Sequence, residues 1–467
     1  MRQVGSLKFK QKEAGRIPMQ QDFLRNNTLP RPAWARRHGR LWALLQALGL
    51  FLIAALLAVQ LKNGSTYATG SWDDYSQALV FGRMLQMQQD QSAPGGFMGV
   101  YTEEWGDGQN RYLYRDNTPV SPEDFHSYTH QTGLQGWALG VLNKVYSVVQ
   151  DDGVARETML YTTNAILYYF ATLLVCAALY RAVGALPALA WLAAVCLAPG
   201  LQTGMKDLYW CLWIWMLPLL AGVALCAATL RRGKTPVWAV MLVGAACMVR
   251  CMCGFEFIST YLILCETPLV WCWAKSLASG RPARPWVVRM VAAGASALTG
   301  VAAALGIWLC QGVLYYGNWK DSLENILGAA GSRMSVSDNT VREGVTVLGV
   351  LAKYLVQDVT PALTAAGVSL TLGQILAVTL AASVLSAAVL LMLRRRDTLA
   401  ALAPMLCVWA LSVAAPCSWL VLSKAHSDIH SHLIPVLFQF SAVPASAALL
   451  AALIVAWVRV ARRPRRA

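Results

Sequence analysis

Long runs of apolar residues constrain this chain more than any other feature of its sequence. A helix needs about 20 mostly apolar residues to cross the hydrocarbon core of a membrane. Only 13% of the residues are charged, which is too few to give several soluble domains a polar surface. We therefore predict an all-α, polytopic integral membrane protein of about ten transmembrane helices. The predicted spans are 41–61, 161–182, 184–200, 208–230, 236–252, 255–274, 287–310, 374–393, 398–420 and 433–458.

The distribution of charge predicts the orientation of these helices. The segments predicted to lie on the same side of the membrane as the N-terminus hold 26 of the 39 lysines and arginines but only three of the 24 acids. Basic loops stay in the cytoplasm, so we expect both termini to be cytoplasmic, with the protein in the inner (plasma) membrane of a cell. The net charge of +15 thus indicates a lipid bilayer as the partner and no nucleic acid. Tryptophans near the ends of the spans are expected to be interfacial anchors: Trp42, Trp210, Trp238, Trp271, Trp286 and Trp419.

The same topology divides the chain into regions. The run at 41–61 is too long for the core of a cleavable signal peptide and is expected to stay as an anchor. The apolar stretch 344–357 predicts an interfacial or re-entrant helix. The regions are a basic cytoplasmic tail at 1–40, a first transmembrane helix at 41–61, an outside or periplasmic loop at 62–160, and a transmembrane bundle at 161–467 with outside segments near 311–373 and 421–432.

The outside loop begins with two adjacent acids, Asp73 and Asp74, about ten residues after the first span. A helical pattern follows at 76–88. The spacing of Ser71 and Asp74 is that of a capping box, which would give Asp74 a structural role. Alternatively, paired carboxylates hold a cation or raise the pKa of one member, and such a carboxylate removes a proton from a hydroxyl nucleophile. The position at the membrane surface makes Asp73 and Asp74 candidate catalytic residues.

Two more polar segments follow in this loop. Residues 103–107 are rich in acids and predict an exposed turn, or a second acidic site in which Glu104 would contact substrate. Residues 126–136 contain two histidines and several glycines, and a second interfacial helix is expected at 137–149.

The arrangement of these elements resembles the GT-C superfamily, the polytopic glycosyltransferases that use polyprenyl-phosphate-linked sugars. The resemblance covers about the first 180 residues. It is carried by Asp73-Asp74-Tyr75 before the helix at 76–88 and by the stretch from Gly133 to Gly136 before the second helix. What the resemblance implies is an acid of this loop acting as general base on an acceptor hydroxyl. No motif identifies the subfamily, the sugar or the acceptor.

A dense polar segment lies at the outside end of the ninth span and contains three of the six histidines. His426 and His430 are four residues apart and would share a helix face, as pairs of metal ligands do. Asp428 and His432 would add ligands for a divalent metal. In a second interpretation, Lys424 and the imidazoles bind a donor phosphate, and in a third the segment is only a polar turn. We favour phosphate, because Lys424 would repel a cation.

Charged residues at membrane depth are costly, so each is a functional candidate. Arg250 and Glu256 flank the turn between the fifth and sixth spans, where they either pair with each other or leave Arg250 to bind phosphate through its planar guanidinium. Arg333 is a further candidate for a phosphate ligand. The remaining charged residues of this kind are Lys206, Asp207 and Glu266.

These patterns favour a membrane glycosyltransferase that moves a hexosyl or pentosyl group from a polyprenyl-phosphate donor to an acceptor hydroxyl on the outer face. No P-loop or G-x-G-x-x-G motif indicates a nucleotide donor. One alternative is a multi-pass transporter or permease, although the two halves of the chain show no paired repeat. The other is a metal-dependent enzyme centred on His426, His430 and His432. No cofactor is required by the favoured interpretation, and a divalent metal is the cofactor that the second alternative would use.

Overall fold

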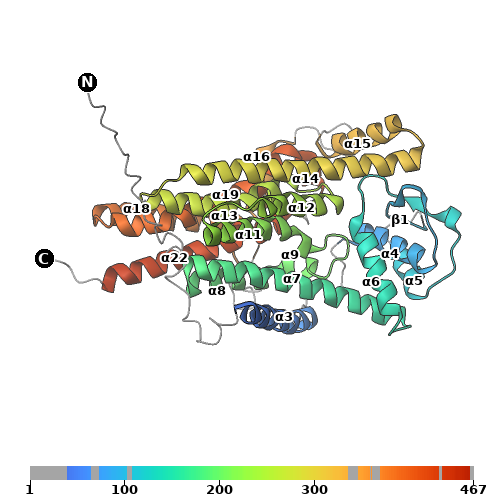
Figure 1. Cartoon of the computed structure of the whole chain (residues 1–467), viewed down its shortest axis with the longest axis horizontal. Helices are drawn as coiled ribbons and strands as arrows, with labels where there is room; N and C mark the ends of the chain where they lie inside the picture. The colour runs from blue at the N-terminus through green and yellow to red at the C-terminus, as the bar shows by residue number, and fades with distance from the viewer. Residues whose placement is uncertain are drawn as a thin grey trace, which may run out of the picture.

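The computed structural model describes residues 39–64, 73–102, 108–334, 345–357, 359, 369–430 and 434–462. In these residues the protein is almost entirely helical, and its one sheet is a pair of two-residue strands. Figure 1 shows a bundle of long helices along the long axis of the molecule, with a smaller lobe at one end.

The lobe is formed by the predicted outside loop. The two helices expected there are present as α4 and α6, and their position at a membrane interface stays a prediction. Arg83 of α4 lies over the ring of Trp137 of α6 at 3.7 Å. Gly82 lets α4 pack on the strand β1, since a β-carbon at this position would lie 2.1 Å from the carbonyl oxygen of Gly99. The elements of the lobe are α4 (Asp74–Gln88), η1 (Pro94–Gly96), β1 (Gly99–Val100), α5 (Gln109–Arg115), η2 (Pro122–Asp124), β2 (His126–Ser127) and α6 (Leu134–Ser147), with β1 and β2 antiparallel.

The bundle helices form where the apolar runs predict them, and their ends differ from the predicted ones by a few residues. The apolar stretch predicted at 344–357 also contains a helix, α16, in its described part. The elements are α7 (Gly153–Val183), α8 (Ala185–Leu197), α9 (Pro199–Gly204), α10 (Leu212–Trp215), α11 (Leu217–Arg232), α12 (Val237–Met252), α13 (Ile258–Ala278), α14 (Arg284–Tyr316), α15 (Trp319–Met334), α16 (Val347–Leu355), α18 (Leu372–Met392), α19 (Arg396–Leu422), α20 (Lys424–Ile429), α21 (Ile434–Phe440) and α22 (Ala442–Arg462).

Six helical stretches of the described chain are long and apolar enough to cross a membrane. They are α7, α10 with α11, α14, α18, α19 and α21 with α22. The other four predicted spans form α8, α12, α13 and a helix before the lobe, α3 (Gly39–Gly64). Three of these four contain only shorter apolar helices, so the total of ten spans stays a prediction.

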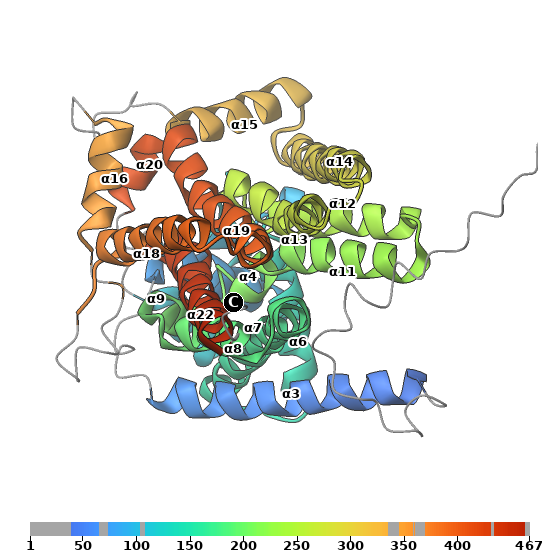
Figure 2. The same ribbon diagram turned by 90° about the vertical axis from the view of Figure 1, so that its left-hand side faces the viewer.

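Helix α3 lies across the bundle instead of along it. It is viewed end-on in Figure 1 and lengthwise in Figure 2, whereas the long bundle helices show the opposite. It packs mainly on α7, where Phe51 and Phe170 meet edge to face at 5.8 Å. Ala54 and Ala58 are buried, but most large apolar side chains of α3 are exposed. Such a helix suits an apolar environment around it. A helix that lies across the bundle does not cross a membrane alongside the bundle helices, so the first span expected at 41–61 stays a prediction.

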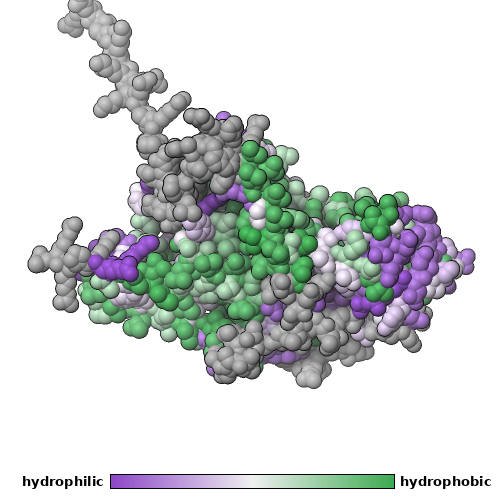
Figure 3. Space-filling model, turned by 90° about the horizontal axis from the view of Figure 1, so that it is seen from below, coloured by the Kyte–Doolittle hydropathy of each residue, from purple (hydrophilic) through white to green (hydrophobic). Residues whose placement is uncertain are grey.

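Apolar side chains cover the outer surface of the bundle, as expected of a membrane protein. The face in Figure 3 has a hydrophobic band between hydrophilic atoms at the lobe and hydrophilic atoms at the opposite end. The opposite end is where several helices finish in basic residues, among them Arg181 of α7, Arg231 of α11, Lys275 of α13 and Arg459 of α22. The lobe and the basic ends therefore lie at the two ends of an apolar body.

Ion pairs attach the lobe to the bundle. The carboxylate of Glu157, near the start of α7, is buried and accepts hydrogen bonds from Arg111 and Arg115 of α5, both at 2.5 Å. Gly153, the first residue of α7, packs closely on the backbone of Arg115. A β-carbon at position 153 would lie 2.1 Å from the carbonyl oxygen of Arg115. These contacts place the lobe directly over the ends of the bundle helices.

Candidate functional site

The candidate site begins at Asp73, which caps the first turn of α4. Its Oδ1 accepts a hydrogen bond from the backbone N–H of Ser76 at 3.1 Å. The predicted capping box is therefore wrong, because the helix begins two residues later than a cap at Ser71 requires. Ser71 and the side chain of Asp74 lie outside the described residues. The structural role proposed for Asp74 belongs to Asp73, but it occupies only one of the two carboxylate oxygens.

The second oxygen of Asp73 is held by Trp210, from the turn before α10. The indole Nε1 of Trp210 donates to Oδ2 of Asp73 at 2.8 Å. Asp207 fixes this turn, because its Oδ1 accepts the backbone N–H groups of Tyr209 and Trp210 at 2.9 and 2.8 Å. Trp210 is 6% exposed, so its predicted role as an interfacial anchor is wrong. The one polar atom of its side chain has a hydrogen-bond partner in Asp73, so the ring can be buried away from the interface.

A buried ion pair between Glu256 and Arg333 lies in the same region. The guanidinium Nη2 of Arg333, on α15, donates to Oε1 of Glu256 at 2.6 Å. Burial by itself disfavours the charged carboxylate, but the adjoining Arg333 outweighs it and lowers the pKa of Glu256 to about 2. The backbone carbonyl of Arg333 also accepts a hydrogen bond from Ser423 at 2.7 Å. Arg333 thus joins the turn before α13 to the polar segment after α19.

Arg250, which the sequence favours as the phosphate ligand, has a structural environment and does not pair with the side chain of Glu256. Its guanidinium donates to the backbone carbonyls of Gly254 and Glu256, at 2.8 and 2.9 Å, and to the hydroxyl of Tyr261 at 3.1 Å. The predicted pairing of the Arg250 and Glu256 side chains is wrong, because the carboxylate turns to Arg333. Arg250 is buried against the rings of Tyr261 and Trp215. It therefore closes the turn between α12 and α13, which leaves Arg333 as the better phosphate ligand.

Tyr128 and Tyr209 connect the lobe acid to the ion pair. Asp73, Glu256 and Arg333 all act electrostatically on both phenols. Burial raises the pKa of Tyr128 to about 12, and Arg333 hydrogen-bonds to its hydroxyl. Both phenols are therefore neutral at physiological pH. The contacts run the same way, because Trp210, which holds Asp73, stacks on Phe257 at 5.5 Å, and Phe257 is the residue after Glu256. Asp73 of the lobe is thus linked through Trp210 and Phe257 to the ion pair of Glu256 with Arg333.

The polar segment after α19 forms the short helix α20. His426 and His430 share a face, as predicted, and their ring centroids are 4.3 Å apart. His426 also packs edge-on against Phe257 and Trp419, with centroids at 6.0 and 5.8 Å, and it acts electrostatically on Glu256. Trp419 is buried, so it too is not the interfacial anchor that its position predicted. The histidine pair therefore borders the ion pair.

The other predicted members of the histidine cluster are placed differently. Asp428 forms an ion pair with Lys353 of α16, with 3.2 Å between Oδ1 and Nζ. Its carboxylate is therefore engaged by a lysine and not by a metal shared with the imidazoles. Lys424, the first residue of α20, is partly exposed. His432 lies outside the described residues. Within the described part of the chain, no group of three histidine, cysteine or acidic side chains is close enough to hold a metal ion.

Two residues with left-handed backbone conformations lie beside the site. Cys211 follows Trp210 and has φ 43°, and Phe257 follows Glu256 and has φ 63°. Both side chains are buried. This conformation is unfavourable for residues with a β-carbon, most of all for bulky ones, and such strain is concentrated at functional sites. The packing around both turns holds Trp210 and Glu256 in place against this cost.

Two further candidates from the sequence are not assigned to this cluster, for different reasons. Glu104 lies outside the described residues, as does the rest of 103–107. Glu266 is in the middle of α13, near Gly294 of α14, and neither of its carboxylate oxygens has a hydrogen-bond partner in the described structure. It belongs to the apolar body and not to the site.

No family model matches the chain, and no curated protein or solved structure matches it.

The arrangement combines an oriented carboxylate with cationic and neutral hydrogen-bond donors. Asp73 is partly exposed and keeps lone pairs beyond its two hydrogen bonds. Arg333, Tyr128 and His426, near Glu256, supply hydrogen-bond donors. Tyr128 and Tyr209 were not predicted from the sequence. An isolated tyrosine, in a polar loop or at the start of an apolar run, gives no signal of its long-range partners. The chemistry available is removal of a proton near a bound anion.

Proposed function

We propose that the protein transfers a sugar from a polyprenyl-phosphate donor to an acceptor hydroxyl on the outer face of the cell inner membrane. The observation that carries this proposal is a chain of contacts between segments far apart in the sequence. Asp73 accepts a hydrogen bond from Trp210, and Trp210 stacks on Phe257 beside the Glu256–Arg333 ion pair. A transferase of this kind needs a base for the acceptor and a positive or hydrogen-bonding environment for the departing phosphate.

In the proposed reaction, the acceptor oxygen attacks the anomeric carbon of the sugar. A new bond forms between that carbon and the acceptor oxygen while the bond to the phosphate oxygen breaks, and the hydroxyl proton passes to Asp73. Negative charge accumulates on the departing phosphate. Arg333 stabilises this charge, with Lys424 and the histidine pair of α20 as additional donors. The proposed orientation places this site outside and both termini in the cytoplasm, as the basic helix ends favour.

The proposal is tested with purified protein in lipid vesicles and a panel of polyprenyl-phosphate sugars, both hexosyl and pentosyl. Release of polyprenyl phosphate is measured by chromatography with and without acceptor glycans or glycolipids. We expect release from at least one donor, together with a labelled product that carries the sugar. Intact donor across the panel, with protein that is folded and correctly inserted, would contradict the proposal.

A second candidate is a metal-dependent enzyme, favoured by the 4.3 Å separation of the His426 and His430 rings. With His432 as a third ligand, this pair would bind a divalent ion. Metal analysis of active protein separates the two candidates. Stoichiometric metal that is lost with activity in His430→Ala supports the metal enzyme, whereas full activity after chelation supports the metal-free transferase.

A further inference from the structure

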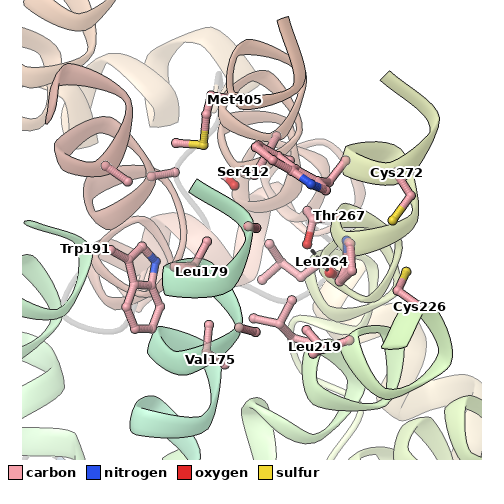
Figure 4. Close-up of a pocket in the computed structure, with 18 of the residues that line it drawn as sticks. Val175, Leu179, Trp191, Leu219, Cys226, Leu264, Thr267, Cys272, Met405 and Ser412 are labelled. Carbon is pink, nitrogen blue, oxygen red and sulfur yellow. Dashed lines mark hydrogen bonds between the residues drawn. The ribbon is translucent and has the colours of Figure 1, made fainter. Parts of the chain in front are cut away.

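A cavity of about 220 Å³ lies inside the helical bundle, apart from the candidate site. Helices α7, α8, α11, α13, α19 and α22 surround it, and Phe440 of α21 also contributes. Figure 4 shows side chains of these helices converging on a shared space, among them Val175, Leu219, Leu264 and Met405. None of the polar residues assigned to the candidate site lines it.

An aromatic layer separates this cavity from the candidate site. Phe440 lines the cavity and meets Trp215 edge to face at 5.8 Å. Trp215 in turn contacts Phe257, beside Glu256, at 5.4 Å. The cavity therefore ends below the polar cluster.

The interior of the cavity is apolar in its chemistry. Most of its lining is aliphatic, aromatic or sulfur-containing. The hydroxyl of Thr267 donates to the carbonyl of Leu264 at 2.8 Å, and that of Ser441 donates to the carbonyl of Leu437 at 2.7 Å. Both hydroxyls are thus bonded within their own helices. The interior suits a hydrocarbon chain better than a polar solute.

Three cations line one end of this apolar space. On each of α7, α11 and α13 a basic residue stands in the last turn of the helix: Arg181, Arg231 and Lys275. All three residues line the cavity, and no carboxylate does. The lining of α11 begins at Leu219 and reaches Arg231, a rise of roughly 18 Å. The cavity therefore extends roughly 18 Å along α11 and ends among positive charges.

We propose that this cavity binds an anionic membrane phospholipid. One acyl chain lies between α7, α11, α13 and α19, and the phosphate of the headgroup lies among Arg181, Arg231 and Lys275. Basic pockets between membrane helices bind anionic headgroups in this way. A zwitterionic lipid would bring its own cation to the three positive charges, and a free anion would leave the apolar space unfilled. The lipid comes from the leaflet at the basic end of the protein.

The binding is tested with purified full-length protein in a nonionic detergent. Phosphatidylglycerol and phosphatidylcholine of the same chain length are titrated, and bound lipid is counted by native mass spectrometry. We expect one tightly bound phosphatidylglycerol, and at least tenfold weaker binding in the triple variant Arg181→Gln, Arg231→Gln, Lys275→Gln. The matched control neutralises three basic residues of the same end that do not line the cavity: Arg284, Arg394 and Arg396. This control should bind as the wild type does.

A second variant, Ala227→Phe, keeps all three cations and fills the cavity from α11. It should also weaken phosphatidylglycerol binding about tenfold while the elution volume and melting temperature stay close to those of the wild type. If Ala227→Phe binds as the wild type does, the lipid sits on the surface and the cavity assignment is wrong. Equal binding of phosphatidylcholine, equal loss in the control triple variant, or competition by soluble glycerol phosphate would each overturn the proposal.

Discussion

Single residues at the candidate site show how a buried charge is kept in place. Glu256 is 4% exposed, and its partner Arg333 is supplied by a different helix. When one member of a buried pair is removed, the other is left as an uncompensated charge, which typically costs about 3–5 kcal/mol. The pair therefore fixes the position of α15 relative to the turn before α13.

We predict that Arg333→Gln lowers the free energy of unfolding by about 3–5 kcal/mol because it leaves Glu256 unpaired. The double variant Arg333→Gln, Glu256→Gln should recover a substantial part of this loss. Thermal or denaturant unfolding in detergent measures both. Additive losses in the double variant would show that the two side chains are not coupled.

The same pair predicts a dependence of stability on pH. The pKa of Glu256 falls from 4.5 to about 2 on folding, because Arg333 overcomes the effect of burial. A group with a lowered folded pKa stabilises the fold above its unfolded pKa and loses that contribution as the pH falls through its folded pKa. The contribution of Glu256 should be constant from pH 8 to about 5 and decline between about 4.5 and 2.

Melting temperatures of the wild type and of Glu256→Gln between pH 2 and 8 check this expectation. The difference between the two proteins should shrink below pH 4.5, and a difference that stays constant down to pH 2 would rule out an ionised Glu256 as its source.

At the scale of elements, the sequence predicts helices well and their mutual contacts poorly. The apolar runs predict the bundle helices to within a few residues at most ends, because the length and hydrophobicity of a run depend on local sequence alone. The capping residue of α4 was misassigned by two positions, since two acids and a serine offered competing caps. The partner of Glu256 was misassigned because Arg333 is 77 residues away in the chain. Only the fold brings that residue to the turn.

Asp73 is the N-cap of helix α4, so the position of α4 determines the position of the candidate base. We predict that Gly82→Ala destabilises the lobe by about 1–3 kcal/mol, because the added β-carbon overlaps the backbone of β1. Activity should fall as well, since α4 must shift away from Trp210. Gly328→Ala on the exposed face of α15 is the matched control, as open space surrounds its α-carbon. Wild-type stability and activity in Gly82→Ala would mean that α4 does not need this close approach.

At the scale of the whole molecule, the apolar body separates the lobe from the basic helix ends. We predict that a single cysteine at Ser121, in a background without the native cysteines, reacts with an impermeant thiol reagent added outside cells. A cysteine at Lys234 should react only after the membrane is permeabilised. Both positions belong to exposed turns at the two ends of the molecule. Labelling of Ser121→Cys only after permeabilisation would invert the proposed orientation.

The central claim is that Asp73 is the base of a sugar transfer supported by the cluster around Arg333. The most direct test is the turnover of Asp73→Asn in lipid vesicles with a donor that the wild type uses. We predict a loss of about 10²–10⁴-fold in turnover, with donor affinity and melting temperature near the wild-type values. Asp90→Asn, which changes an exposed lobe acid paired with Lys144, should keep full turnover. Wild-type turnover in Asp73→Asn would contradict the claim.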